Sequence, residues 1–233
     1  GGEAFTATAG SPTTFMAAAT MSTANGGFDL DDGSDLVITS GSGNISIASI
    51  QGTLDEDVSI SAGTGSIGVG AIGDGTGIDN VSLTAAVITL TGDIQTSNGD
   101  SLGAVTLTGG ITVGGDVSVN SSAGSGTVAF NGAVSADAAG RHLQVNVGSG
   151  NVTFASTVQG ATALDQLTVN AANNVDFDAA GTITGALTQT TGTGTTTFDA
   201  AVSAGGVSVR NTIGVSFAST LTATGGNDIE LAS

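Results

Sequence analysis

The residues best suited to chemistry form a short acidic run near the start of the chain. Asp29, Asp31, Asp32 and Asp35 surround Gly33. Calcium takes several oxygen ligands and tolerates irregular geometry, so carboxylates clustered around a glycine favour it over other cations. The spacing departs from an EF-hand loop, because the glycine comes one position early and no glutamate closes the loop. We predict calcium as a candidate ligand of this run, with solvated turn carboxylates as the alternative.

A second candidate set lies in the middle of the chain. His142, the only histidine, adjoins Arg141, one of two arginines, and Asp137 and Asp165 lie nearby in the sequence. Parallel β-helix enzymes that cleave sugar chains need clustered carboxylates, and in many cases basic residues that bind sugar acids. The sequence has no nucleophile elbow in a strand–helix context, no P-loop and no histidine-rich metal set. We therefore assign no catalytic or cofactor-binding residues and expect no enzyme activity. The alternative is a carbohydrate-binding or polysaccharide-depolymerising β-helix of the tailspike kind.

The elements that must position these residues repeat along the chain. A unit of apolar, small and apolar residues recurs nine times, with steps of 22, 23, 24, 23, 24, 23, 21 and 19 residues. The nine units end at Ile38, Ile60, Leu83, Leu107, Phe130, Phe154, Phe177, Phe198 and Phe217. A short strand at a nearly constant period indicates a solenoid, because each repeat can bury its apolar side only against its neighbours.

Two more short apolar strands follow within each repeat, as in Leu143-Gln144-Val145 and Val207-Ser208-Val209. Three strands per turn of about 22 residues predict an all-β fold: a single-chain parallel β-helix with three sides. Right-handed crossovers are the default for parallel strands, so we expect a right-handed coil of about nine to ten rungs.

Strand alternation sets where the side chains of the repeated unit point. The two outer residues face inward and the middle residue faces solvent, giving a polar outer stripe. Rungs stack at about 4.8 Å, so like residues lie above one another. We expect a core stack of aromatic rings formed by Phe130, Phe154, Phe177, Phe198 and Phe217. In this interpretation the phenylalanines mark the architecture and are not a binding stripe.

Three asparagines directly follow the third strand of their repeats: Asn120, Asn146 and Asn170. Their amides could bond from rung to rung as an internal ladder. The alternative is that asparagine simply tolerates the turn conformation at these corners.

The repeat divides the chain into two parts. Residues 1–35 do not follow it, and we predict that they form an N-terminal cap or an arm that docks on a neighbouring subunit. Residues 36–233 are predicted to be β-solenoid repeats. The chain stops within a strand unit, Ile229-Glu230-Leu231, with no evident C-terminal cap. An open rung end favours head-to-tail association with a second copy, or cover by the rest of a larger protein.

The composition narrows the classes of partner. Twenty acidic residues face two arginines and no lysine, for a net charge of −18. Nucleic acid and anionic membranes bind through clustered Lys and Arg, so neither is expected as a partner. There is no cysteine for disulfides or thiolate metal sites, and no apolar run long enough for a transmembrane helix. The protein is expected to need no cofactor, apart from the candidate calcium.

The repeats resemble those of a known group of proteins. The units Asn151-Val152-Thr153-Phe154 with Leu167-Thr168-Val169-Asn170, and Gly214-Val215-Ser216-Phe217 with Ile229-Glu230-Leu231, carry the resemblance. They are similar to the β-strand repeats of large bacterial surface proteins, the filamentous-haemagglutinin-like and autotransporter-like adhesins. The resemblance covers residues 36–233 and implies an exported, extracellular or cell-surface solenoid without catalytic activity. Such a protein would serve adhesion, a biofilm matrix or filament building, with its own copies, glycans or cell surfaces as partners.

Overall fold

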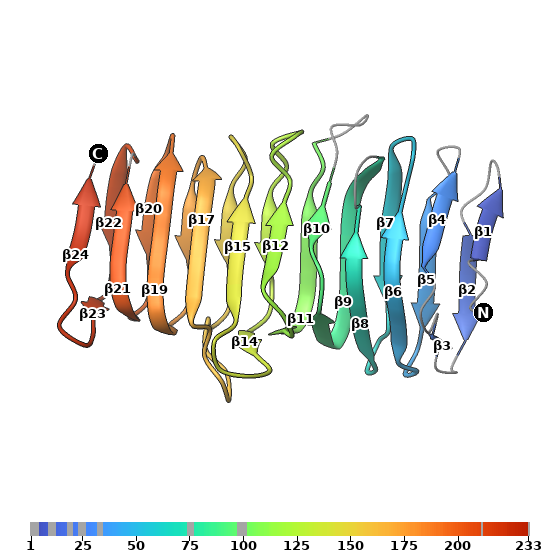
Figure 1. Cartoon of the computed structure of the whole chain (residues 1–233), viewed down its shortest axis with the longest axis horizontal. Helices are drawn as coiled ribbons and strands as arrows, with labels where there is room; N and C mark the ends of the chain where they lie inside the picture. The colour runs from blue at the N-terminus through green and yellow to red at the C-terminus, as the bar shows by residue number, and fades with distance from the viewer. Residues whose placement is uncertain are drawn as a thin grey trace.

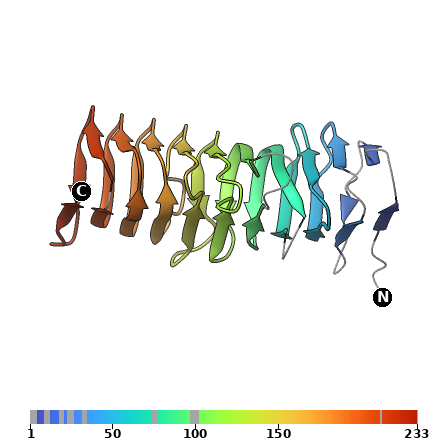
Figure 2. The ribbon, with the colours of Figure 1, turned by 90° about the horizontal axis from the view of Figure 1, so that it is seen from above.

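The computed structural model describes residues 5–8, 13–17, 21–22, 27–31, 35–73, 77–96, 102–210 and 212–232, with side chains from residue 27 onward except that of Asp31. This part of the chain consists of strands, turns and bends, without a helix, and its 24 strands join into one parallel sheet. The sheet is wound into a rod with the two ends of the chain at opposite ends (Figures 1 and 2). The predicted all-β parallel solenoid is therefore confirmed.

The strands are short because the chain turns a corner after each one. In chain order they are β1 (Phe5–Thr8), β2 (Thr13–Ala17), β3 (Met21–Ser22), β4 (Phe28–Asp31), β5 (Leu36–Ser40), β6 (Ile45–Gln51), β7 (Glu56–Ser61), β8 (Ser66–Ile72), β9 (Ile78–Leu90), β10 (Ile94–Gln95), β11 (Val105–Val113), β12 (Val117–Asn120), β13 (Val128–Phe130), β14 (Val134–Ala136), β15 (His142–Asn146), β16 (Val152–Phe154), β17 (Gln166–Ala172), β18 (Val175–Phe177), β19 (Gly181–Gly192), β20 (Thr195–Phe198), β21 (Val202–Arg210), β22 (Gly214–Phe217), β23 (Leu221–Ala223) and β24 (Ile229–Ala232).

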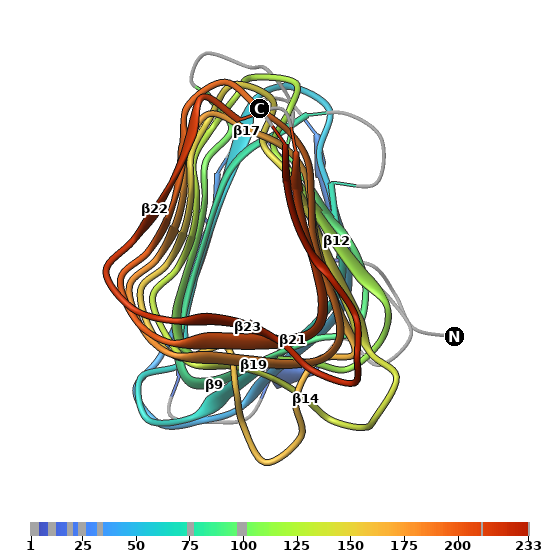
Figure 3. The same cartoon turned by 90° about the vertical axis from the view of Figure 1, so that its left-hand side faces the viewer.

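The rungs enclose a triangular interior with three faces (Figure 3). The first face is defined by the paired column Leu36, Val58, Val81, Val105, Val128, Val152, Val175, Thr196 and Val215. The second face is defined by the column Ile45, Ile67, Ile88, Ile111, Val134, Val158, Gly181, Val202 and Leu221. The third face is defined by the column Ile50, Ile72, Ile94, Val119, Val145, Val169, Gln189, Val209 and Leu231.

The coil is right-handed, as predicted. With the C-terminal end toward the viewer, the chain passes from β22 at the left to β23 below and then upward on the right toward the C-terminus (Figure 3). This is an anticlockwise path that advances toward the viewer. Right-handedness follows from the twist of the strands, which packs a parallel crossover back onto its own sheet in that sense only.

The core is a set of stacked apolar columns. The inward residues of the three faces are almost all Val, Ile, Leu and Phe, and most of them have no more than 3% of their surface exposed. Phe130, Phe154, Phe177, Phe198 and Phe217 stack as predicted, with ring centroids 4.9, 4.9, 5.1 and 5.6 Å apart. The rings are nearly parallel because one rung spacing of about 4.8 Å separates identical side chains.

The parallel ladder begins before residue 36, the position at which the repeats were predicted to start. Strand β1 pairs with β4, β2 pairs with β5, and β3 pairs with β6, all in parallel register. Residues in the interval 1–35 therefore contribute strands to all three faces. A cap or docking role for this interval stays a prediction, although its described strands continue the rungs.

The predicted amide ladder is not what the structure shows at Asn120. Its side-chain oxygen accepts bonds from the backbone N–H and hydroxyl of Ser122, within its own turn. Asn146 lies beside Asn120 on the next rung, but a register shift then places Ala171 opposite Asn146 instead of Asn170. Asn120 therefore stabilises its own turn, in line with the alternative that asparagine suits the turn conformation.

Hydroxyl groups that directly follow third-face strands bond to backbone carbonyls of the connections to the first face. Thr96 and Ser121 are buried, and each donates its hydroxyl hydrogen across its own loop, to the carbonyls of Gly103 at 2.6 Å and Gly126 at 2.7 Å. A carbonyl left unpaired in the core would cost about 1–3 kcal/mol, so these hydroxyls make the loops compatible with burial.

One rung interrupts the apolar core. Gln189 stands between Val169 and Val209 on the third face, and its Oε1 accepts the hydroxyl hydrogen of Thr196 at 2.5 Å. Its Nε2 is buried and has no hydrogen-bond partner among the described residues. The amide fills the space beside Gly192, where an added Cβ would lie 2.5 Å from Nε2.

We expect that copying the preceding rung into this one stabilises the protein. The variant Gln189→Val, Gly192→Ala, Thr196→Val reproduces Val169, Ala172 and Val175, and should raise the free energy of unfolding by about 1–2 kcal/mol, because it removes a buried unpaired donor. Gly192→Ala alone should lower it by about 1 kcal/mol, since the new methyl group displaces the bonded amide. Urea unfolding followed by circular dichroism measures both changes, and equal effects of Gly192→Ala with and without Gln189→Val would contradict the clash.

Candidate functional site

The residues predicted to carry acid–base chemistry meet at the corner between the second and third faces. Strands β14 and β15 deliver Asp137, Arg141 and His142 to this corner, and the loop before β17 delivers Asp165. The loops after β14 and after Val158 project outward from it (Figure 3). The loops that lead into β15 and β17 end side by side, because these two strands pair in parallel on neighbouring rungs.

Arg141 and Asp137 form a two-point ion pair within one loop. The Arg141 Nε–Asp137 Oδ1 distance is 2.6 Å and the Arg141 Nη2–Asp137 Oδ2 distance is 3.1 Å. The hydrogen bond from Arg141 lowers the pKa of the Asp137 carboxyl below its usual value. Both side chains are partly exposed, so the pair fixes the loop more than it stabilises the whole fold.

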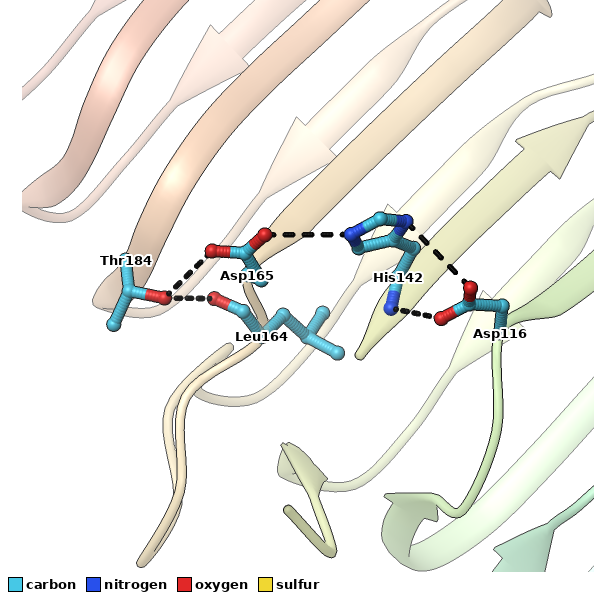
Figure 4. A network of polar contacts seen from close by, with 5 residues as sticks. All are labelled: Asp116, His142, Leu164, Asp165 and Thr184. Carbon is cyan, nitrogen blue, oxygen red and sulfur yellow. Dashed lines mark hydrogen bonds and ion pairs between the residues drawn. The ribbon is translucent and has the colours of Figure 1, made fainter. Parts of the chain in front are cut away.

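His142 lies between two carboxylates on the rungs before and after it (Figure 4). Its Nε2 is 3.3 Å from Asp165 Oδ2, and its Nδ1 is 3.8 Å from Asp116 Oδ2. The backbone N–H of His142 also donates to Asp116 Oδ1 at 3.1 Å. Thr184, one rung further, donates its hydroxyl hydrogen to the Leu164 carbonyl at 3.1 Å, with Asp165 Oδ1 at 3.4 Å. The corner is thus a polar column across four rungs.

The four residues named from the sequence therefore come together as two pairs. Arg141 is engaged with Asp137, and His142 is engaged with Asp165. The ring of His142 therefore has a carboxylate within ion-pair distance of each nitrogen. The sequence analysis missed Asp116, although an aspartate just before the strand Val117–Asn120 is the signal that places it there.

Two hollows follow the outside of the third face. One, of about 250 Å³, is lined by Asp93, Asp116, Ser118, His142 and Gln144 together with Val117. The other, of about 480 Å³, lies nearer the C-terminal end, where glycines leave the corner without side chains. Its lining includes Gly185, Gly205, Gly206, Thr188, Ser208 and Glu230.

The predicted calcium run is only partly described. Asp29 is exposed on β4, while the side chain of Asp31 and the whole of Asp32 lie outside the described residues. Asp35 uses Oδ1 to accept the backbone N–H of Asp57 at 3.0 Å. Among the side chains that the structure describes, no group of three or more His, Cys, Asp or Glu residues is arranged to hold a metal ion.

Asp35 belongs to a second feature that the sequence analysis missed. Asp or Asn precedes the first-face strand on several rungs, and its Oδ1 accepts the backbone N–H of the corresponding residue on the next rung. The pairs are Asp35 with Asp57, Asp57 with Asn80, Asn80 with Ala104, Asn151 with Asn174, and Asn174 with Thr195. We name this series the Asx column. Its signal in the sequence is Asp or Asn directly before the first residue of the repeated unit.

A patch of carboxylates lies on the outside of the first face. Asp176 occupies the outward position of β18, with Asp178 and Asp199 close by. Partial burial, and to a lesser extent the neighbouring charges, raise the pKa of Asp176, while a hydrogen bond from Thr197 opposes the shift. Ionised Asp176 is therefore disfavoured by folding, so its effect on stability is unfavourable at neutral pH and disappears in acid.

Comparison with known proteins gives no relative for this chain. No family model, curated protein or solved structure matches it. The described residues include no helix long and apolar enough to cross a membrane. The functional argument therefore depends on the geometry of the rod and its corner.

Removing Arg141 should release Asp137. In Arg141→Gln we expect the pKa of Asp137 to rise toward its usual value, because the bond that favours the carboxylate is lost. A depressed pKa means that the pair contributes stability above the pKa of the unfolded chain and loses it as the pH falls through the folded pKa. Carboxyl carbon NMR titration of both proteins measures the shift, and an unchanged Asp137 titration would contradict the pairing.

Proposed function

We propose that this protein is a non-catalytic, extracellular structural rod, which stacks end to end into a filament or forms the shaft of a surface adhesin or matrix protein. The observation that carries the proposal is the uninterrupted parallel ladder, which pairs each rung only with its neighbours on all three faces. In such an architecture the number of rungs sets the length of the rod, and the faces form extended surfaces.

The use of the polar residues supports the non-catalytic part of the proposal. Asp116, His142, Asp165 and the Asx column all bond from one rung to another. These bonds run parallel to the rod axis and supplement the backbone ladder. These polar side chains therefore hold neighbouring rungs together.

In the proposed end-to-end stack, the last described rung would make the contact. Phe217, Ile229 and Leu231 are 42–45% exposed, whereas the residues with which they pair on the preceding rung are at most 3% exposed. The edges of β22, β23 and β24 offer backbone groups for a further parallel rung. Strands β1, β2 and β3 lie on the same three faces, and the proposed stack would place them against this rung.

Charges placed on this end should block association. We expect the wild-type chain to form concentration-dependent end-to-end oligomers, and Ile229→Lys, Leu231→Lys to shift it toward monomer. The change should be at least tenfold in apparent dissociation constant, because an unpaired ammonium group would be buried at the contact. Sedimentation velocity measures the distribution, and negative-stain images show whether the particles lengthen without widening.

A matched control separates geometry from charge. The variant Leu54→Lys, Leu102→Lys makes the same charge change at apolar residues that are 59% and 64% exposed on the sides of the rod. It should associate like the wild type. A wild-type chain that stays monomeric at all concentrations would overturn stacking and leave the shaft as the remaining form of the proposal.

We further propose that the rod needs no cofactor, because many of its polar side chains bond from one rung to the next. Chelation of divalent cations should leave the thermal midpoint unchanged within error. A fall in the midpoint that is abolished by Asp29→Asn together with Asp32→Asn would contradict this and assign calcium to the acidic run.

One observation favours the second candidate, binding of a glycan. The groove over Gly205 and Gly206 is open, and Thr188, Ser208 and Glu230 line it with hydroxyl and carboxylate oxygens. A Cβ at Gly206 would meet only Asn227 side-chain atoms, at 3.5–4.0 Å, so we expect Gly206→Val to narrow the groove. A glycan array signal that Gly206→Val removes would support binding, and a reducing-sugar assay distinguishes binding from cleavage.

A further inference from the structure

His142 has an unusual position for the only histidine of the chain. It begins β15, and its ring bridges toward carboxylates on the rungs before and after it (Figure 4). A neutral imidazole carries one N–H and can donate to only one carboxylate, leaving the lone pair of its other nitrogen facing the second. A protonated imidazole donates from both nitrogens. Protonation therefore changes the number of rungs that the ring can join.

The chain contains few types of ionisable side chain. The chain has no Lys, Cys or Tyr, and its other ionisable side chains are carboxylates and two arginines. Carboxylates ordinarily titrate below about pH 5 and arginine above about pH 12. Imidazole is the side chain that ordinarily titrates between about pH 5 and pH 8. His142 is the only imidazole of the chain.

Carboxylates lie on both sides of the ring. Asp116 and Asp165 face its two nitrogens, and Asp93 lines the same hollow. The neighbouring cation, Arg141, is held by Asp137 in a two-point bond. The carboxylates of Asp93, Asp116 and Asp165 lie along the corner, and the charge of Arg141 also acts on Asp116. An imidazolium at His142 would pair with Asp116 and Asp165.

We propose that His142 is a pH-dependent clasp, which in mild acid joins the rungs of Asp116, His142 and Asp165 and loosens this corner as the pH rises. The stabilisation is complete when the imidazole is protonated and is lost as the ring gives up its proton.

The clasp acts on the parts of the rod that project most from it. Asp137 and Arg141 belong to the loop that leads into β15, and Asp165 ends the loop that leads into β17. The backbone N–H of Asp165 donates to the Arg141 carbonyl at 2.9 Å, so the ends of the two loops are already in contact. Tightening the ring between Asp116 and Asp165 orders both loops, and a surface read by a partner would then differ between mildly acidic and neutral media.

Amide hydrogen exchange measured by NMR tests the proposal on the intact chain. After correction for intrinsic exchange, amides of β15 and β17 should exchange roughly two- to fivefold more slowly at about pH 5.5 than at about pH 8, the effect expected of partly exposed ion pairs. Amides of β5 and β7, far from the corner, should show no such change. The single imidazole signal in the proton spectrum reports protonation directly.

The variant His142→Gln separates the clasp from a structural role. It keeps the backbone donor to Asp116 and a side-chain donor near Asp165, but does not titrate. The proposal requires the pH dependence of β15 and β17 to vanish in His142→Gln and to weaken in Asp165→Asn. An equal pH dependence in wild type and His142→Gln, or none in the wild type, would overturn it.

Discussion

The backbone hydrogen bond between rungs is the constraint on which the rest of this protein depends. It places each residue about 4.8 Å from its counterpart on the next turn, so side chains must tolerate a neighbour of nearly the same kind. Valine and phenylalanine do this well, as the nearly parallel rings from Phe130 to Phe217 illustrate. Like charges do not, which accounts for a surface made mainly of Ser, Thr, Asn and Gly.

The same constraint explains how much of the fold could be predicted. Alternation within each unit fixes inward and outward positions, and stacking carries that assignment from rung to rung, so the three faces and the phenylalanine stack followed from the sequence. The start of the ladder was missed, although β2 carries Thr13-Thr14-Phe15, the same sequence as the counted unit Thr196-Thr197-Phe198, and pairs in register with Leu36-Val37-Ile38. Strands β1 and β3 do not show the unit and are placed by their pairing with β4 and β6.

The corner could be predicted only in outline. Asp137, Arg141, His142 and Asp165 were recognisable as unusual residues, but their partners depend on loop lengths that periodicity does not encode. Asp116 lies 26 residues before His142, several more than one average rung, and bonds to both its backbone and its ring. The Asx column was missed for another reason: its members satisfy backbone donors of the next rung, a role that resembles ordinary turn chemistry in a single sequence.

Polar groups in this rod fall into two classes that the ladder treats differently. Those that bond along the axis, such as Asp57 to Asn80, add to an existing contact between rungs and place little demand on the core. Those that bond within a rung, such as Gln189 to Thr196, stand in apolar columns and leave a buried donor unsatisfied. Each rung contacts only its two neighbours. A side chain that contacts both the preceding and the following rung therefore links three rungs. His142 is placed to do that, because its ring lies between carboxylates on the rungs before and after it.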